Sequence, residues 1–169
     1  MPLENTDFPA GADPFSLLDE ATACLPDAPP TFICTACGEC CRTSDPDMGV
    51  TMNYADVVRI AAHLDMSIPA FIGQHAERFE FAVGDDMYEA FQLRFGEESC
   101  VFLKDDNRCG IHEVKPWQCR FTPYRFFYEG DRDLWCMKDV EVPAGWTSGG
   151  TDAAFLAGLR KVPEPAGGR

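Results

Sequence analysis

Four cysteines occupy eight consecutive positions in this chain of 169 residues: Cys34, Cys37, Cys40 and Cys41. The first three are separated by two residues each, so a single turn of irregular backbone can direct their thiols at one point. Gly38 lies within the run and tolerates the positive φ that such a tight loop needs. The spacing C-x2-C-x2-C supplies three ligands to bacterial iron–sulfur clusters, and it also serves small zinc sites. The run therefore predicts a thiolate metal site.

The remaining ligands are expected among four later cysteines, namely Cys100, Cys109, Cys119 and Cys136. These lack the second C-x2-C pair of a zinc ribbon, which favours iron–sulfur slightly and leaves zinc open. Adjacent side chains usually diverge, so Cys40 and Cys41 are expected to serve different partners. Either two metal centres share the eight cysteines, or one cluster has a neighbouring ligand or redox-active thiol. Cys24 stands apart as a spare thiol.

Thiolate ligands bring negative charge, and nearby cations are expected to offset it. Arg42 directly follows the early run and Arg120 directly follows Cys119, so both are predicted to hydrogen-bond to the site or to neutralise it. The alternative for both is a solvated surface arginine.

The three histidines are weaker candidates as ligands. His112 follows Cys109 by three residues and could supply a nitrogen ligand, although a structural or surface role is preferred because thiols are plentiful. His63 and His75 fall on predicted helical faces and are expected to pack.

Composition narrows the class of protein. The formal net charge of −14 argues against nucleic-acid binding, which depends on clustered Lys and Arg. No basic segment followed by an apolar run begins the sequence, and no apolar stretch is long enough to cross a membrane. We therefore expect a cytoplasmic protein, whose cysteines are reduced thiols and not disulfides.

The pattern of elements predicts one small α+β domain organised around the cysteine site, with helices after the first cluster and short antiparallel strands carrying the later cysteines. Residues 1–29 are predicted to be a proline-rich acidic arm, with one short helix over 14–24. Residues 30–162 are predicted to form the metal-binding domain, and residues 163–169 are predicted to be a disordered tail.

Local signals place the helices and strands. Asn53 and Asp56 predict a capped helix to about Leu64, and Ser67 caps a second helix that includes Phe79. A strand is expected over 91–95, with Cys100 to Leu103 as its partner and a polar turn over 104–108. Further strands are expected over 125–128 and 134–136, and a last helix runs from about Thr151 to Lys161.

Beyond spacing alone, the chain resembles a known family. The run Cys34-x-x-Cys37-Gly-x-Cys40-Cys41, with Cys100-x-Phe-Leu, Cys109-x-Ile and Pro116-x-x-Cys119-Arg120, looks like the bacterial YkgJ-type CxxCxxCC cysteine-cluster family, described as a zinc- or iron-chelating domain. The resemblance covers about residues 30–140. It departs at His112 and Lys115, where the family tends to have Tyr and Arg.

The resemblance implies a metal-binding protein that chelates zinc or iron. Because the cysteines are spread from Cys34 to Cys136, the metal is expected mainly to hold a loop-rich fold together. The alternative is a redox or catalytic iron–sulfur enzyme, for example one related to protein lysine N-methylation, because flagellin lysine N-methylases carry the same cluster. No G-x-G-x-x-G unit for a nucleotide-like cofactor accompanies it here. A protein partner for the acidic arm is a third hypothesis.

Overall fold

A computed structural model of the chain describes residues 36–42, 49–120 and 155–162. The predicted arm over 1–29, the tail over 163–169, the first helix and the two strands within 125–136 lie outside these residues. So do three of the cysteines, Cys24, Cys34 and Cys136.

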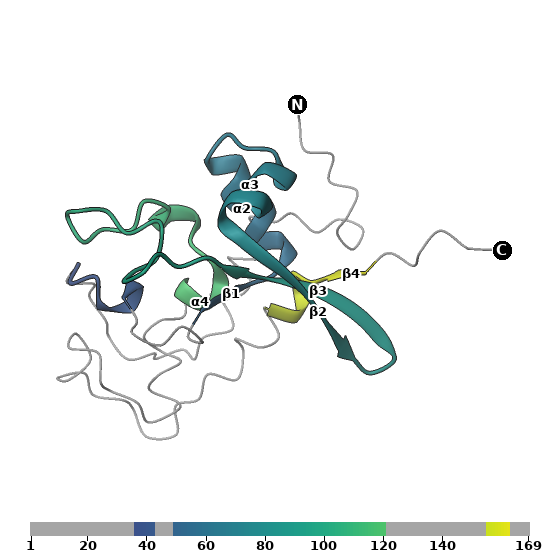
Figure 1. The fold of residues 1–169 in the computed structure, drawn as a ribbon. Helices are drawn as coiled ribbons and strands as arrows, with labels where there is room; N and C mark the ends of the chain where they lie inside the picture. The colour runs from purple at the N-terminus through teal and green to yellow at the C-terminus, as the bar shows by residue number, and fades with distance from the viewer. Residues whose placement is uncertain (1–35, 43–48, 121–154, 163–169) are drawn as a thin grey trace, which may run out of the picture.

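An antiparallel sheet forms one layer of the fold (Figure 1). Strand β2 (Ala76–Val83) and strand β3 (Asp86–Leu93) make a long hairpin, which turns at Gly84 with φ of 61°. Strands β1 (Val50–Met52) and β4 (Arg160–Lys161) both pair with β3 along its other edge. Strand β3 is therefore the centre of the sheet, and β2 lies at its edge.

Helix α2 (Tyr54–His63) begins where the sequence predicts and ends within one residue of the expected Leu64. The side chain of Asn53 accepts a hydrogen bond of 2.8 Å from the Asp56 N–H, and the Asp56 carboxylate accepts one of 3.2 Å from the Asn53 N–H. This reciprocal pair satisfies two backbone donors that a helix start would otherwise leave unpaired.

Helix α3 (Ile68–His75) is also capped as predicted, because the Ser67 hydroxyl accepts a 3.3 Å hydrogen bond from the Ala70 N–H. The prediction that this helix includes Phe79 is wrong. The backbone is already extended at Ala76, and Phe79 lies in β2, opposite Ala90 of β3. All eight residues of β2 pair with β3, and this pairing favours an extended backbone although the apolar spacing also fits a helix.

The core lies where α2 and α3 meet the sheet. The fully buried side chains come from both layers: Met52, Val57, Ile60, Phe71 and Phe91 each have 0% exposure. Burying an apolar side chain of this size contributes roughly 1.5–3 kcal/mol. Helices packed on a small antiparallel sheet confirm the predicted α+β class.

The segment after β3 is less regular than predicted. The expected strand from Cys100 to Leu103 is reduced to single bridges, Phe95 with Cys100 and Leu103 with Cys109. The reason is a tight turn, in which the Leu103 N–H donates to the Cys100 carbonyl at 3.0 Å. The polar turn over 104–108 is confirmed, and two short helices follow, η2 (His112–Val114) and α4 (Trp117–Arg120).

The C-terminal described segment returns to the sheet. Residues 155–157 are helical, but the predicted helix does not continue to Lys161, because Arg160 and Lys161 form β4 beside β3. Arg160 also pairs with the buried carboxylate of Glu89, and this contact fixes the strand. Within the part of the chain that the structure describes, no helix is long and apolar enough to cross a membrane.

Candidate metal centre

The early cysteine run forms a tight turn that ends in the one-turn helix η1 (Glu39–Cys41). Gly38 precedes it with φ of 75°, which confirms that the loop needs a residue tolerant of positive φ. The Cys41 N–H donates to the Gly38 carbonyl at 3.1 Å and closes the turn. As a result Cys40 faces solvent, whereas Cys41 packs against the hydrophobic core.

The sulfur atoms of Cys40 and Cys41 lie 3.9 Å apart. Two ligands of one tetrahedral zinc–thiolate site, with zinc–sulfur bonds of about 2.3 Å, are separated by about 3.8 Å. The expectation that adjacent side chains diverge therefore does not hold for this pair, whose spacing suits a single ion.

A direct backbone contact joins the early run to the later cysteines. The Cys100 N–H donates to the Cys41 carbonyl at 2.7 Å, and Arg42 and Ser99 form an antiparallel bridge beside it. Cys109 follows in the next turn, through its bridge with Leu103. Two segments about 60 residues apart in sequence are thus held side by side.

Packing on the hydrophobic core brings Cys119 to the same region as Cys41, Cys100 and Cys109. Cys100 is buried with 8% exposure and belongs to the core cluster that α2, α3 and the sheet build. Partly buried cysteines pack against this same cluster, and they are Cys41, Cys109 and Cys119. Cysteines from η1, from the 100–109 turn and from α4 therefore pack on one core cluster. Cys37 is half-buried in the same loop as Cys40.

Burial and mutual repulsion oppose ionisation of most of these thiols. Burial is the main cause that raises the pKa of Cys119, and the charges of Cys100, Cys40 and Cys109 raise it further. Burial also raises the pKa of Cys100 and of Cys109. A cluster of this kind stays largely protonated at neutral pH until a cation offsets its negative charge.

Cys40 differs from its neighbours. A hydrogen bond from the Cys41 thiol lowers the pKa of Cys40 to about 6, and the same bond raises the pKa of Cys41. The shared hydrogen bond therefore favours ionisation of Cys40 over that of Cys41.

Lys115 supplies a cation that the sequence did not single out for this role. Its positive charge opposes the burial that raises the pKa of Cys109 and Cys119, and it adds to the hydrogen bond that lowers the pKa of Cys40. Lys115 directly precedes Pro116 and α4. In the sequence, the position of Lys115 directly before Pro116-x-x-Cys119 is the signal that could have indicated a role near the thiols.

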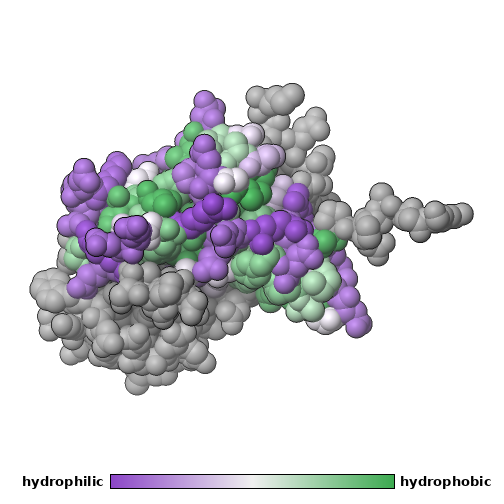
Figure 2. Space-filling model, viewed as in Figure 1, coloured by the Kyte–Doolittle hydropathy of each residue, from purple (hydrophilic) through white to green (hydrophobic). Residues whose placement is uncertain are grey.

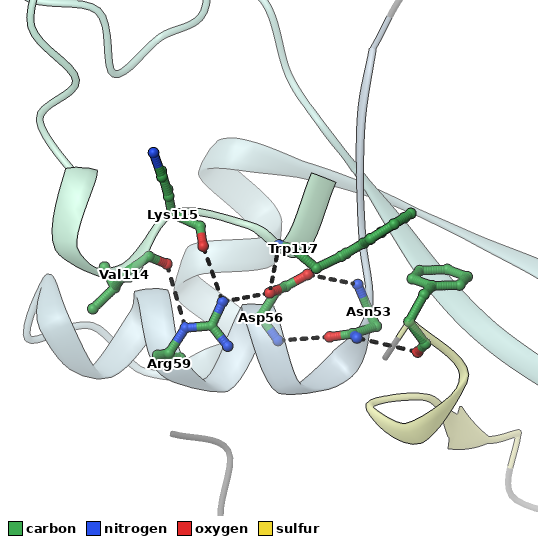
Figure 3. Close-up of polar contacts among 7 residues, drawn as sticks. Asn53, Asp56, Arg59, Val114, Lys115 and Trp117 are labelled. Carbon is green, nitrogen blue, oxygen red and sulfur yellow. Dashed lines mark hydrogen bonds and ion pairs between the residues drawn. The ribbon is translucent and has the colours of Figure 1, made fainter. Parts of the chain in front are cut away.

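A buried ion pair on α2 positions the segment that carries Lys115 and Cys119 (Figure 3). The Arg59 guanidinium binds the Asp56 carboxylate at 2.5 Å, and these side chains have 2% and 1% exposure. Arg59 also donates to the carbonyls of Val114 at 3.4 Å and Lys115 at 3.1 Å. The backbone N–H of Trp117 donates to Asp56 at 3.1 Å, which fixes the start of α4.

The two predicted arginines make other contacts in the described structure. Arg42 donates to the Cys37 carbonyl at 3.1 Å and to the Asn107 side chain at 2.5 Å, so it braces the loop backbone. The Arg120 N–H closes α4 by donating to the Pro116 carbonyl at 2.9 Å. Neutralisation of sulfur by either guanidinium stays a prediction.

The histidines divide into packed and exposed residues. His75 lies between Phe71 and Phe102, with ring centroids 5.5 and 5.0 Å away, and its predicted packing role is confirmed. His63 is exposed at the end of α2, so the same prediction is wrong for it. His112 is exposed on η2, and the positive charge of Lys115 is the main cause that lowers its pKa.

The donor set fits zinc or iron. Thiolates are the ligands that both zinc and iron–sulfur clusters prefer, and the gathered side chains of Cys40, Cys41, Cys100, Cys109 and Cys119 offer only sulfur. Among the described residues, no three His, Cys, Asp or Glu side chains already stand at ligating distances from one point. Ligation would therefore draw the thiols closer together.

Comparison with known proteins agrees with this donor set. A curated relative, "Uncharacterized protein MJ0661" of Methanocaldococcus jannaschii, is 24% identical over 113 residues, which are 63% of this chain and 55% of that protein. The chain thus spans about half the length of that relative. No solved structure matches. Residues 33–138 match the family described as "CxxCxxCC: Putative zinc- or iron-chelating domain", and the chain belongs to this family.

Proposed function

We propose that this chain binds zinc, iron or an iron–sulfur cluster through thiolates drawn from separate segments of the chain. The observation that carries the proposal is the 2.7 Å hydrogen bond between the Cys100 N–H and the Cys41 carbonyl, which brings an early and a later cysteine together. Packing of Cys109 and Cys119 on the same core cluster supports it.

The proposed ligands are the eight cysteines of the motif and its later partners: Cys34, Cys37, Cys40, Cys41, Cys100, Cys109, Cys119 and Cys136. Of these, Cys40 and Cys41 have a sulfur–sulfur distance suited to one tetrahedral ion. A metal ion would supply the positive charge that a buried group of thiolates lacks. Arg42, Arg120 and Lys115 then limit the remaining negative charge.

The metal has a structural role in this proposal. The cysteines that the structure describes belong to the loop ending in η1, to the turn over 100–109 and to α4, which are short, irregular elements. A metal bound by all three would cross-link them, so part of the binding free energy would become folding free energy. Thiolate ligands must stay reduced to bind metal. The proposal therefore places the protein in a reducing compartment such as the cytoplasm.

Elemental analysis and the visible spectrum of anaerobically purified protein test the proposal. Zinc gives a colourless protein, whereas an iron–sulfur cluster gives a brown protein with iron and acid-labile sulfide. Cys100→Ser should lower the metal content severalfold, and Cys24→Ser, the matched control outside the motif, should leave it unchanged. Wild-type protein that contains no zinc or iron, even after reconstitution under reducing conditions, would refute metal binding.

A further inference from the structure

Strand β2 lies at the edge of the sheet that the described residues form. Among the described residues it pairs only with β3, and six of its eight residues are exposed on both faces of the hairpin. Figure 1 shows the β2–β3 hairpin running past the helices that cover the rest of the sheet. An exposed edge presents backbone N–H and C=O groups that can pair with another strand.

Apolar side chains cover this projecting part of the hairpin. Phe79 is 40% exposed, Val83 41% and Met87 45%, which places them among the most exposed large hydrophobic side chains. Figure 2 shows hydrophobic surface over the same end of the molecule. A sheet edge with exposed apolar side chains gains from a partner that covers them.

The charges of β2 determine which partner fits. Arg78 and Glu80 flank Phe79 and form an ion pair, with 2.7 Å between Arg78 Nη1 and Glu80 Oε1. Their side chains are 40% and 41% exposed. Arg78 is also held by the buried carboxylate of Glu89 at 2.5 Å, so its guanidinium has a fixed position on the strand. A strand that reads positive, aromatic, negative is complementary to an antiparallel copy of itself.

We propose that β2 pairs with β2 of a second copy of this chain, antiparallel and with the two-fold axis at Phe79. In this register Arg78 of each chain lies opposite Glu80 of the other, on the face of the sheet that carries Glu89. The opposite face brings the two Phe79 rings together, with Phe81 of each chain diagonal to them. The two sheets become one continuous sheet, and the exposed edge of each is removed.

Neighbouring registers are less favourable for electrostatic reasons. A two-fold axis at Glu80 places two carboxylates directly opposite each other, and an axis at Arg78 does the same with two guanidiniums. Like charges directly opposite each other in a sheet are destabilising, whereas opposite charges stabilise the pair. An axis at Phe81 avoids repulsion but leaves Arg78 and Glu80 without oppositely charged partners in the second copy.

Sedimentation of the full chain under reducing conditions tests this pairing. Wild-type protein should be a dimer that dissociates on dilution. Glu80→Lys turns two attractive contacts into two repulsive ones and should raise the dimer dissociation constant by about tenfold or more. Glu77→Lys makes the same charge change on the same exposed strand, opposite Phe81 of the partner, and should leave the dissociation constant within about threefold.

A second variant tests the contact between the two Phe79 rings. Phe79→Lys places two like charges on the two-fold axis and should make the protein monomeric at concentrations where wild type is dimeric. Wild-type protein that is monomeric at every concentration would overturn the proposal. So would a Glu80→Lys protein that dimerises as tightly as the Glu77→Lys control. The assay reads mass alone, so its result is independent of metal content.

Discussion

The backbone N–H of Trp117 donates a hydrogen bond of 3.1 Å to the Asp56 carboxylate, so the helix that carries Cys119 is fastened to the first turn of α2. The same carboxylate accepts the N–H of Asn53 at 3.2 Å and pairs with Arg59 at 2.5 Å. One buried side chain therefore starts α2, satisfies a buried cation and positions part of the candidate metal centre.

Asp56→Ala should be strongly destabilising. It removes the capping acceptor and leaves the Arg59 guanidinium, with 2% exposure, buried without the Asp56 carboxylate that it binds. Removing one partner of a buried ion pair typically costs about 3–5 kcal/mol. Urea denaturation of the reduced protein measures the change. Lys161→Ala breaks an exposed pair with Asp86 and is the control; it should leave the free energy of unfolding nearly unchanged.

Gly38→Ala should impair the metal site more than it impairs the fold. The residue has φ of 75°, and a Cβ there would lie 2.4 Å from the Arg42 Nη1 atom, which donates to the Cys37 carbonyl. Gly84→Ala is the matched control, because Gly84 has φ of 61° and a Cβ added there would meet nothing within 4 Å.

Both glycine variants should lose about 1–2 kcal/mol of unfolding free energy from the left-handed backbone. Only Gly38→Ala should also weaken zinc binding, measured by competition with a chromophoric chelator. Equal zinc affinities in the two variants would show that the space beside Arg42 is unimportant for the site.

Metal affinity should rise with pH. Burial raises the pKa of Cys100, Cys109 and Cys119, so these thiols are protonated near pH 7 without metal and must release protons when they bind it. Each proton released makes the apparent affinity about tenfold stronger per pH unit. Cys40, with a pKa of about 6, contributes to this slope only near and below that pH.

Zinc competition assays between pH 6 and 8 measure the slope, and calorimetry in buffers with different ionisation enthalpies counts the protons. A zinc affinity that does not change over this pH range would contradict protonated ligands. Removal of the metal with a chelator should lower the melting temperature, because metal binding contributes to folding in this proposal.

Two further glycines should respond to alanine with opposite signs. A Cβ on Gly158 would lie 2.2 Å from the Asn53 side chain, which caps α2 and donates to the Phe155 carbonyl at 3.2 Å. Gly158→Ala should therefore cost about 1–3 kcal/mol. Gly73 lies in α3 with nothing within 4 Å, and Gly73→Ala should stabilise the protein by about 0.5–1 kcal/mol. Thermal unfolding of both variants tests the contrast.

Local chemistry was sufficient to predict the helix starts. The Asn53–Asp56 pair and the Ser67 cap each depend on hydrogen bonds spanning three residues, and both form as expected. The end of α3 was not predictable in this way. Phe71, His75 and Phe79 recur every four residues, a spacing that fits a helix and a strand alike, and pairing with β3 decides in favour of a strand at Phe79.

The candidate site shows the same limit. The cysteines could be predicted as ligands from the sequence, and the family match over residues 33–138 supports a metal-chelating role for this region. The sequence did not indicate that Arg59 binds the carbonyls of Val114 and Lys115, which lie 55 and 56 residues further along the chain. Arg59 lies on a helix in a pattern typical of a solvated cation, and only the tertiary arrangement of η2 and α4 over α2 reveals its role.

The backbone contact between Cys41 and Cys100 affects the thermodynamics of metal capture. Bringing together two points about 60 residues apart in a flexible chain costs about 4 kcal/mol in loop-closure entropy. Here a peptide hydrogen bond and the surrounding core keep these points adjacent within the folded protein. An incoming ion would meet a partly preorganised chelate, and most of its affinity would remain available for holding the ion against competing cellular ligands.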